Sequence, residues 1–121
     1  MNLRKPVLIA LLLAAAPAAG APQEDNAAAI RAGRNLATSV CFACHIVTNN
    51  QNPPPVLGPG IPSFQDIADR PDVTAGALVE RMKDATWHDA ALPPTRLPMS
   101  HLSDRERSEV AAYILSLRHN R

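Results

Sequence analysis

Cys41-Phe42-Ala43-Cys44-His45 is the stretch that decides how the rest of this 121-residue chain can fold. It holds both cysteines of the sequence and ends in one of its four histidines. Two cysteines at this spacing occur in redox-active disulfides, in metal clips and in thioether attachment of a haem. The surroundings of the motif distinguish among these alternatives.

His45 favours haem attachment. A thioredoxin-like pair lies at the start of a helix that follows a strand, whereas this motif follows a predicted helix and no alternating strand pattern occurs in the sequence. A zinc site would need further ligands, and the histidines include no His-x₃₋₅-His pair. Haem attachment uses two thiols and an imidazole from the same turn, and Cys-x-x-Cys-His supplies all three. A disulfide or a metal clip remains the alternative.

The N-terminus agrees with this interpretation. Arg4 and Lys5 precede an apolar run over residues 7–16, and small residues follow up to Ala21, a pattern typical of a secretory signal peptide. We expect residues 1–21 to be cleaved and residues 22–121 to form one periplasmic domain, since bacteria complete haem attachment outside the cytoplasm. An uncleaved leader is the alternative, and only that leader would tie the chain to a membrane.

Composition limits the function and the core. The chain has twelve basic and eleven acidic side chains, and the loss of Arg4 and Lys5 with the leader would bring the net charge to about −1. Such a balance does not attract nucleic acid. With two Phe, one Tyr and one Trp, a domain of about 100 residues has little aromatic bulk, so a large flat apolar cofactor would add buried surface.

The periodicity predicts an all-α domain with proline-rich loops at residues 46–62 and 88–102. In the last helical segment, Ser103 and Glu106 have the spacing of a capping box. The predicted helices cover residues 23–40, 64–68, about three turns within 73–87, and 103–118.

The motifs, taken in order, resemble those of the class I, mitochondrial-type c-type cytochromes over nearly the whole mature region. CFACH (41–45) resembles the family's haem-binding motif, and LGPGI (57–61) resembles its Gly-Pro loop. LPMSHLSDRERSEVAAYILSL (97–117) resembles its methionine loop and final helix. The resemblance implies a small cytochrome c fold in which helices and loops wrap around one covalently attached haem.

The resemblance also implies a set of site residues. Cys41 and Cys44 would form thioether bonds to haem c, and His45 would be the proximal iron ligand. The carbonyl of Pro59 would accept the other imidazole proton of His45, which fixes the orientation of the ring. Met99 would be the sixth ligand of the iron.

Other residues compete for these roles or for contacts near them. His88 and His101 are rivals for the sixth position, as is a vacant site, while Met82 is better explained as core. Trp87 could contact a haem propionate, although plain core burial explains it equally well.

The family crosses its first and last helices at a small residue. Gly33, Val110 and Tyr113 match that contact, and close approach there requires a residue without a side chain. The family usually has an aromatic residue one turn later, where this sequence has Ala37.

The implied function is that of a monohaem carrier, not an enzyme, which cycles its iron between Fe(III) and Fe(II) in a periplasmic electron-transfer chain. Its partners would be a redox protein donor and acceptor. As an alternative, the chain could be the haem subunit of an oxidoreductase complex with a dehydrogenase or a terminal oxidase. A thiol-disulfide exchange role for Cys41 and Cys44 is less favoured.

Overall fold

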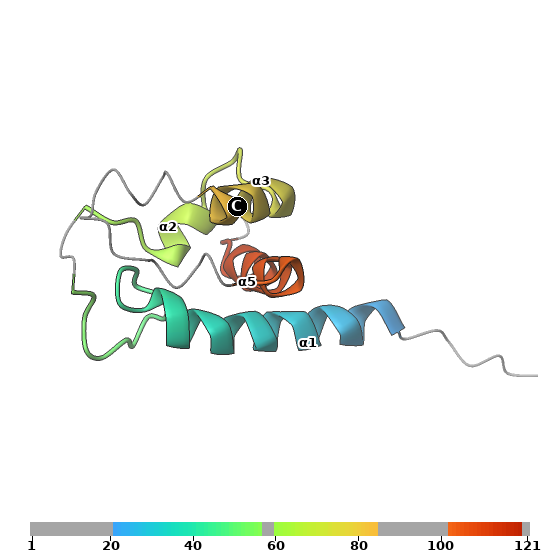
Figure 1. Cartoon of the computed structure of the whole chain (residues 1–121), viewed down its shortest axis with the longest axis horizontal. Coiled ribbons are helices and arrows are strands. Elements are labelled where there is room, and N and C mark those ends of the chain that lie inside the picture. Colours follow the sequence, from blue (N-terminus) through green and yellow to red (C-terminus); the bar gives the residue numbers. More distant parts are fainter. Residues whose placement is uncertain (1–20, 57–59, 85–101, 120–121) are drawn as a thin grey trace, which may run out of the picture.

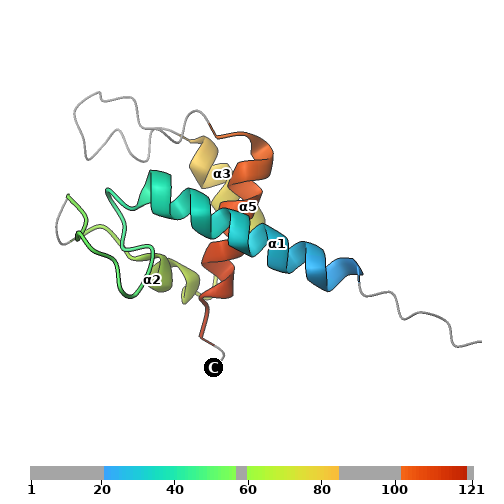
Figure 2. The same ribbon diagram turned by 90° about the horizontal axis from the view of Figure 1, so that it is seen from below.

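The helices of the domain are packed around one central helix, α5. The computed structural model describes residues 21–56, 60–84 and 102–119, and within these ranges it contains helices and no strand, so the predicted all-α class is confirmed. In Figure 1, α5 lies between α1 on one side and α3 on the other, and Figure 2 shows α1 running across α5. The helices are α1 (Ala21–Leu36), α2 (Phe64–Ala68), α3 (Ala75–Lys83) and α5 (Asp104–Ser116), and a π-helical turn (Ala37–Cys41) continues α1.

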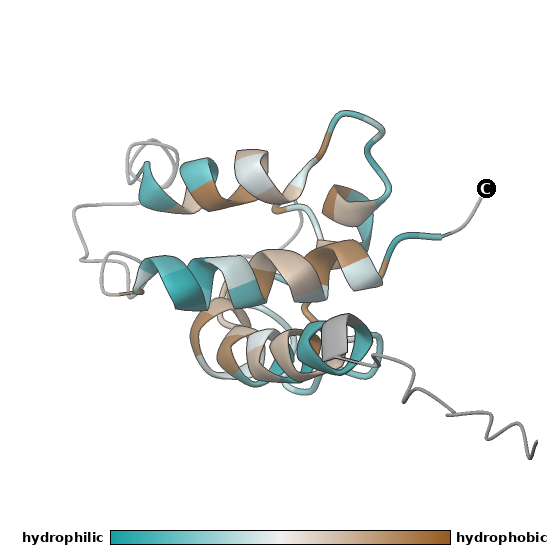
Figure 3. Ribbon diagram, turned by 90° about the vertical axis from the view of Figure 1, so that its right-hand side faces the viewer, coloured by the Kyte–Doolittle hydropathy of each residue, from teal (hydrophilic) through white to brown (hydrophobic). Residues whose placement is uncertain are grey.

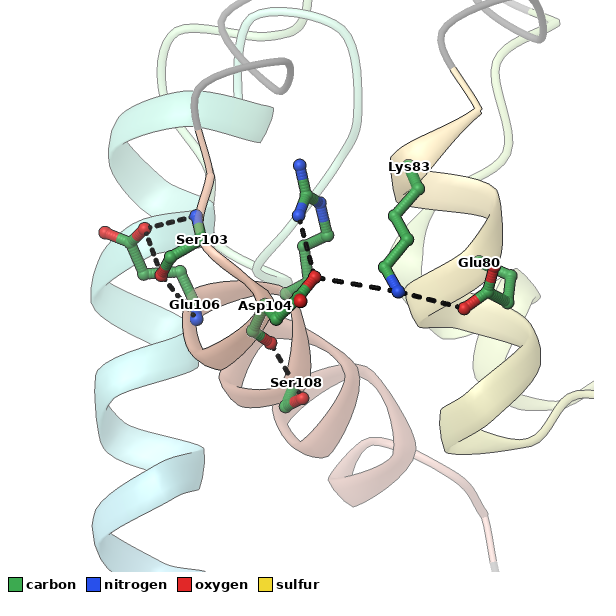
Figure 4. Close-up of polar contacts among 7 residues, drawn as sticks. Glu80, Lys83, Ser103, Asp104, Glu106 and Ser108 are labelled. Atoms are coloured by element: carbon green, nitrogen blue, oxygen red, sulfur yellow. Dashed lines mark hydrogen bonds and ion pairs between the residues drawn. The ribbon is translucent and has the colours of Figure 1, made fainter.

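Local capping signals set where the helices begin. Ser103 precedes α5, and its hydroxyl accepts a hydrogen bond from the Glu106 amide at 3.3 Å while the Glu106 carboxylate accepts one from the Ser103 amide at 2.7 Å (Figure 4). This is the capping box predicted from the sequence. Thr74 caps α3 in a simpler way, through a hydrogen bond of 3.2 Å from the Ala77 amide to its hydroxyl.

α1 and α5 cross at Gly33 with their backbones almost in contact. A β-carbon placed on Gly33 would lie 1.9 Å from the Glu109 carbonyl oxygen and 2.9 Å from the Val110 nitrogen. The predicted contact of Gly33 with Val110 is therefore confirmed, and Tyr113 is buried one turn further along α5. Ala37, at the position where the family that the sequence resembles usually has an aromatic residue, is fully buried in the same core.

The core is small and consists mostly of aliphatic and small side chains. Among the described residues, the largest that are fully buried are Val47 and Val110. Met82 is partly buried against this cluster, as predicted for a core residue. Figure 3 shows hydrophobic and hydrophilic residues recurring in turn along the helices, as expected when each helix buries one face. The buried cluster comprises Ala37, Cys41, Val47, Phe64, Ala68, Leu78, Val110, Ala111, Tyr113 and Ile114.

Ion pairs join the end of α3 to the start of α5. Lys83 Nζ lies 3.1 Å from Glu80 Oε1 and 3.6 Å from Asp104 Oδ1, and Arg107 also contacts Asp104 at 3.1 Å (Figure 4). The Asp104 side chain is 78% exposed, and an ion pair this open to solvent contributes little to stability. Apolar packing therefore holds these helices together more than charge does.

The C-terminal residues hold α2 in place. Arg118 donates hydrogen bonds to the carbonyl oxygens of Ala68 at 2.6 Å and Val73 at 2.8 Å. Gln65 of α2 donates in return to the Leu117 carbonyl at 2.6 Å. The residues just before α2 contact the cysteine motif. The hydrogen bonds that hold α2 therefore also fix the backbone on one side of that motif.

Substituting Gly33 tests the helix crossing. We expect Gly33→Ala to lower the free energy of unfolding by about 3 kcal/mol, because the new methyl group would overlap the backbone of α5 and force the helices apart. Guanidinium denaturation of the purified protein measures this change.

Gly76→Ala in α3 is the matched control. A β-carbon there meets no atom within 4 Å, so alanine is expected to be neutral or stabilising by up to about 1 kcal/mol. Equal stability of the two variants would contradict the close crossing.

Candidate cofactor site

The cysteine motif forms one tight turn at the end of the first helix. The amides of Cys44 and His45 both donate to the carbonyl of Cys41, at 3.1 and 2.9 Å. This turn brings together the two thiols and the imidazole that the sequence singled out. A single structural unit thus presents all three groups.

A widened helical turn delivers Cys41 to this position. The Phe42 amide donates to the carbonyl of Ala37, five residues earlier, at 3.1 Å. The Thr38 hydroxyl lies 3.0 Å from the carbonyl oxygen of Arg34, and the Ser39 hydroxyl lies 2.9 Å from that of Asn35. Sequence periodicity predicted a regular helix here. The only sequence signal of the widened turn is the adjacent pair Thr38 and Ser39, because hydroxyl side chains can donate hydrogen bonds to carbonyls of the preceding turn. π-helical turns often occur at functional sites.

His45 is held in one orientation and one tautomer. Its Nδ1 lies 2.7 Å from the Pro62 carbonyl oxygen, which can only accept, so Nδ1 carries the proton and the Nε2 lone pair is free to bind a metal. The ring packs at a tilt against Phe64, with 5.5 Å between centroids. Burial lowers the pKa of His45, while the hydrogen bond to Pro62 acts in the opposite direction. The neutral imidazole that iron requires is thereby favoured.

The carbonyl that contacts the His45 ring belongs to Pro62. Among the described residues Pro62 is the acceptor of the imidazole proton, whereas Pro59, which the resemblance implied, lies outside these residues and stays a prediction. The reason is local: the Phe64 amide donates to the Ile46 carbonyl at 2.9 Å, which draws this backbone against the motif. The Ser63 cap of α2 then fixes the chain just after Pro62. The Ser63-x-x-Asp66 capping pattern was the signal that could have identified it.

Side chains close the loop that follows the motif. Gln51 bridges it, donating from Nε2 to the Phe42 carbonyl at 2.9 Å and accepting at Oε1 from the Val47 amide at 2.8 Å. The Tyr113 hydroxyl of α5 donates to the Val47 carbonyl at 2.7 Å. The loop that carries His45 is thus tied both to itself and to the last helix.

The two sulfurs are free thiols in a setting unsuited to disulfide exchange. Cys41 is only 6% exposed, and burial, with a smaller contribution from Cys44, raises its pKa to about 11. It also ends a helix instead of beginning one, so the helix dipole does not stabilise a thiolate. This environment disfavours the thiol-exchange alternative.

The donor set fits haem c. Attachment needs two thiols that are not bonded to each other and an imidazole with a free Nε2, and the turn offers these groups together. Phe42 and Val56, 36% and 84% exposed, add apolar surface in and after the motif. The other residues proposed from the sequence for this site, or as rivals for it, lie outside the described part of the chain: Pro59, Trp87, His88, Met99 and His101.

A helical domain with this turn defines a class of protein, one that carries its haem covalently on a Cys-x-x-Cys-His motif. The family model for cytochrome c matches residues 30–118, and the chain belongs to the cytochrome c family. The chain is also similar to cytochrome c-552 of Bradyrhizobium diazoefficiens, with 36% identity over 86 residues, which cover 71% of this chain and 72% of the relative. No solved structure matches.

These findings confirm the resemblance to class I monohaem cytochromes. Haem c is the cofactor, and Cys41 and Cys44 are the thiols that match its attachment motif. The protein is a haem electron carrier by family. Within the described ranges, none of the helices has the length and apolarity needed to cross a bilayer.

Removing one hydroxyl tests the link between α5 and the motif loop. We expect Tyr113→Phe to lower the free energy of unfolding by about 1–3 kcal/mol, because the buried Val47 carbonyl loses its donor. Guanidinium denaturation of the oxidised holoprotein measures the loss. Ser108→Ala removes an exposed hydroxyl from the same helix and should change stability by no more than about 0.5 kcal/mol. Similar losses in both variants would show that the Tyr113 bond does not hold the loop.

Proposed function

We propose that this protein is a periplasmic, monohaem cytochrome that takes one electron from a redox protein and passes it to another. The observation that carries the proposal is the motif turn, which contains two free thiols and an imidazole whose Nδ1 is hydrogen-bonded to Pro62. The family's role as haem electron carriers supports it.

Each residue of the turn has a distinct task. Cys41 and Cys44 would anchor the cofactor through thioether bonds, and His45 would bind iron through Nε2. Bound haem iron supplies one-electron cycling between Fe(III) and Fe(II). The Pro62 carbonyl makes His45 a stronger donor and prevents its ring from turning.

The surrounding bonds keep the iron-binding group in place during electron transfer. Gln51 and Tyr113 restrain the Val47 backbone two residues beyond His45. Phe64 packs against the His45 ring and lies 6.3 Å from the Tyr113 ring, centroid to centroid. A ligand held on several sides needs little rearrangement when the oxidation state changes, which suits a carrier without catalytic groups.

Met99 is proposed as the second axial ligand. A thioether favours Fe(II) and raises the reduction potential, which suits a carrier. Support comes from the residues that follow it: Leu102 is 8% exposed, and Ser103 caps α5, so the chain is fixed shortly after Met99.

The composition of the holoprotein tests the proposal as a whole. We expect the purified periplasmic protein to have the mass of residues 22–121 plus one haem, a haemochrome spectrum of a haem with two thioether bonds, and a reversible one-electron titration. The same mass reports cleavage after Ala21. Alkylation of free Cys41 and Cys44, with no haem mass, would contradict the proposal.

Replacing Met99 tests the axial ligand separately. We expect Met99→Ala to abolish the weak far-red sulfur-to-iron absorption of the oxidised protein, because that band requires a thioether on the iron. Met82→Leu alters a partly buried core methionine and should leave the band unchanged. A band that persists in Met99→Ala would show that another group binds the iron.

A further inference from the structure

A concave site lies beside the loop that follows the motif. A cavity of about 410 Å³ opens between α1, the loop after the motif, the start of α2 and the second half of α5. Cys41, Cys44 and His45 are not among its lining residues. Its volume falls in the range of about 300–1,000 Å³ typical of small-molecule sites.

The charged residues that line this cavity are both arginines. Arg31 and Arg34 lie three positions apart on α1, so their side chains leave the same face of the helix. Within the part of the chain that the structure describes, no carboxylate pairs with either of them, whereas Arg105 and Arg107 of α5 each have an acidic partner. The two guanidinium groups are therefore available to an anion.

Arg34 also acts on the wall of the cavity. Burial raises the pKa of Tyr113, and the positive charge of Arg34 opposes that rise. Tyr113 lines the cavity and bonds to Val47, another lining residue. The positive charge of Arg34 thus acts on a residue that lines the cavity.

The remaining surface is divided between apolar groups and uncharged polar groups. Buried Val47 and Tyr113 contribute apolar surface, together with partly buried Ile30 and Leu117. Polar side chains of the loop after the motif, such as the exposed Asn50, also line the cavity. A ligand complementary to this surface has one anionic end and an apolar body.

We propose that this cavity binds a small carboxylate with an apolar body. The carboxylate lies against Arg31 and Arg34, where guanidinium forks form paired charge-assisted hydrogen bonds, and the body covers the apolar wall. The site adds a ligand-binding role to electron transfer and does not depend on which group is the sixth iron ligand.

Benzoate is the probe, titrated into the reduced, diamagnetic holoprotein at fixed ionic strength while amide chemical shifts are recorded. We expect saturable shifts at Val47 and Asn50 and none at Gly76 in α3. Benzyl alcohol has the ring without the charge, and acetate has the charge without the ring. Each should bind at least tenfold more weakly than benzoate.

Arginine variants assign the charge. Arg31→Gln and Arg34→Gln should each weaken benzoate binding at least tenfold, while Arg105→Gln, an exposed arginine outside the cavity, should change it less than twofold. Amide spectra without ligand verify that every variant is folded. Absence of saturable shifts at the cavity would overturn the proposal. Equal binding of benzoate and benzyl alcohol would do the same, as would an equal loss in Arg105→Gln.

A peptide titration distinguishes two possible sources of the carboxylate. A free metabolite and a glutamate side chain of another protein present the same chemistry. If acetyl-Leu-Glu-Leu-amide binds tenfold tighter than benzoate and the same peptide with glutamine in place of glutamate does not, the source of the carboxylate is a protein side chain. Weaker binding of the peptide would identify a free small molecule.

Discussion

The close crossing of α1 and α5 at Gly33 is the constraint on which the rest of the structure depends. With no side chain between them, the two backbones approach so closely that a Gly33 β-carbon would lie only 1.9 Å from the Glu109 carbonyl oxygen. This contact fixes the direction of α1, and the cysteine motif lies at its end. It also brings Tyr113 of α5 within hydrogen-bonding distance of Val47. One glycine therefore determines where the motif and its support meet.

The motif turn owes its geometry to segments on both sides of it. The π-helical turn before it sets where Cys41 leaves the helix, and the backbone before α2 supplies the carbonyl that holds His45. α2 is held in turn by Gln65 and Arg118 through bonds with the C-terminal segment. The orientation of one imidazole thus depends on contacts that reach nearly to the end of the chain, which explains why a small domain with a modest core can hold it.

Charge is distributed differently on the two sides of α5. Toward α3, Lys83 and Arg107 meet Asp104 in exposed ion pairs that add little free energy (Figure 4). Toward α1, Arg31 and Arg34 line a cavity without an acidic lining residue. On the α3 side each charge has a partner of opposite sign. On the α1 side positive charge lies beside apolar surface, and this difference distinguishes a candidate ligand site from ordinary surface ion pairs.

The sequence by itself determined the chemistry of the motif, the helical class, the Ser103 capping box and the glycine at the helix crossing. Each of these rests on residues close together in the chain or on a requirement, such as the missing side chain of Gly33, that a single residue meets. Only the tertiary structure decided that the Pro62 carbonyl contacts His45 and that Arg31 and Arg34 share a cavity with Tyr113. These features depend on which backbone and side-chain groups meet after loops have closed. The hydrogen bond between Tyr113 and Val47, which are 66 residues apart, is a contact of this kind, and no local sequence pattern specifies it.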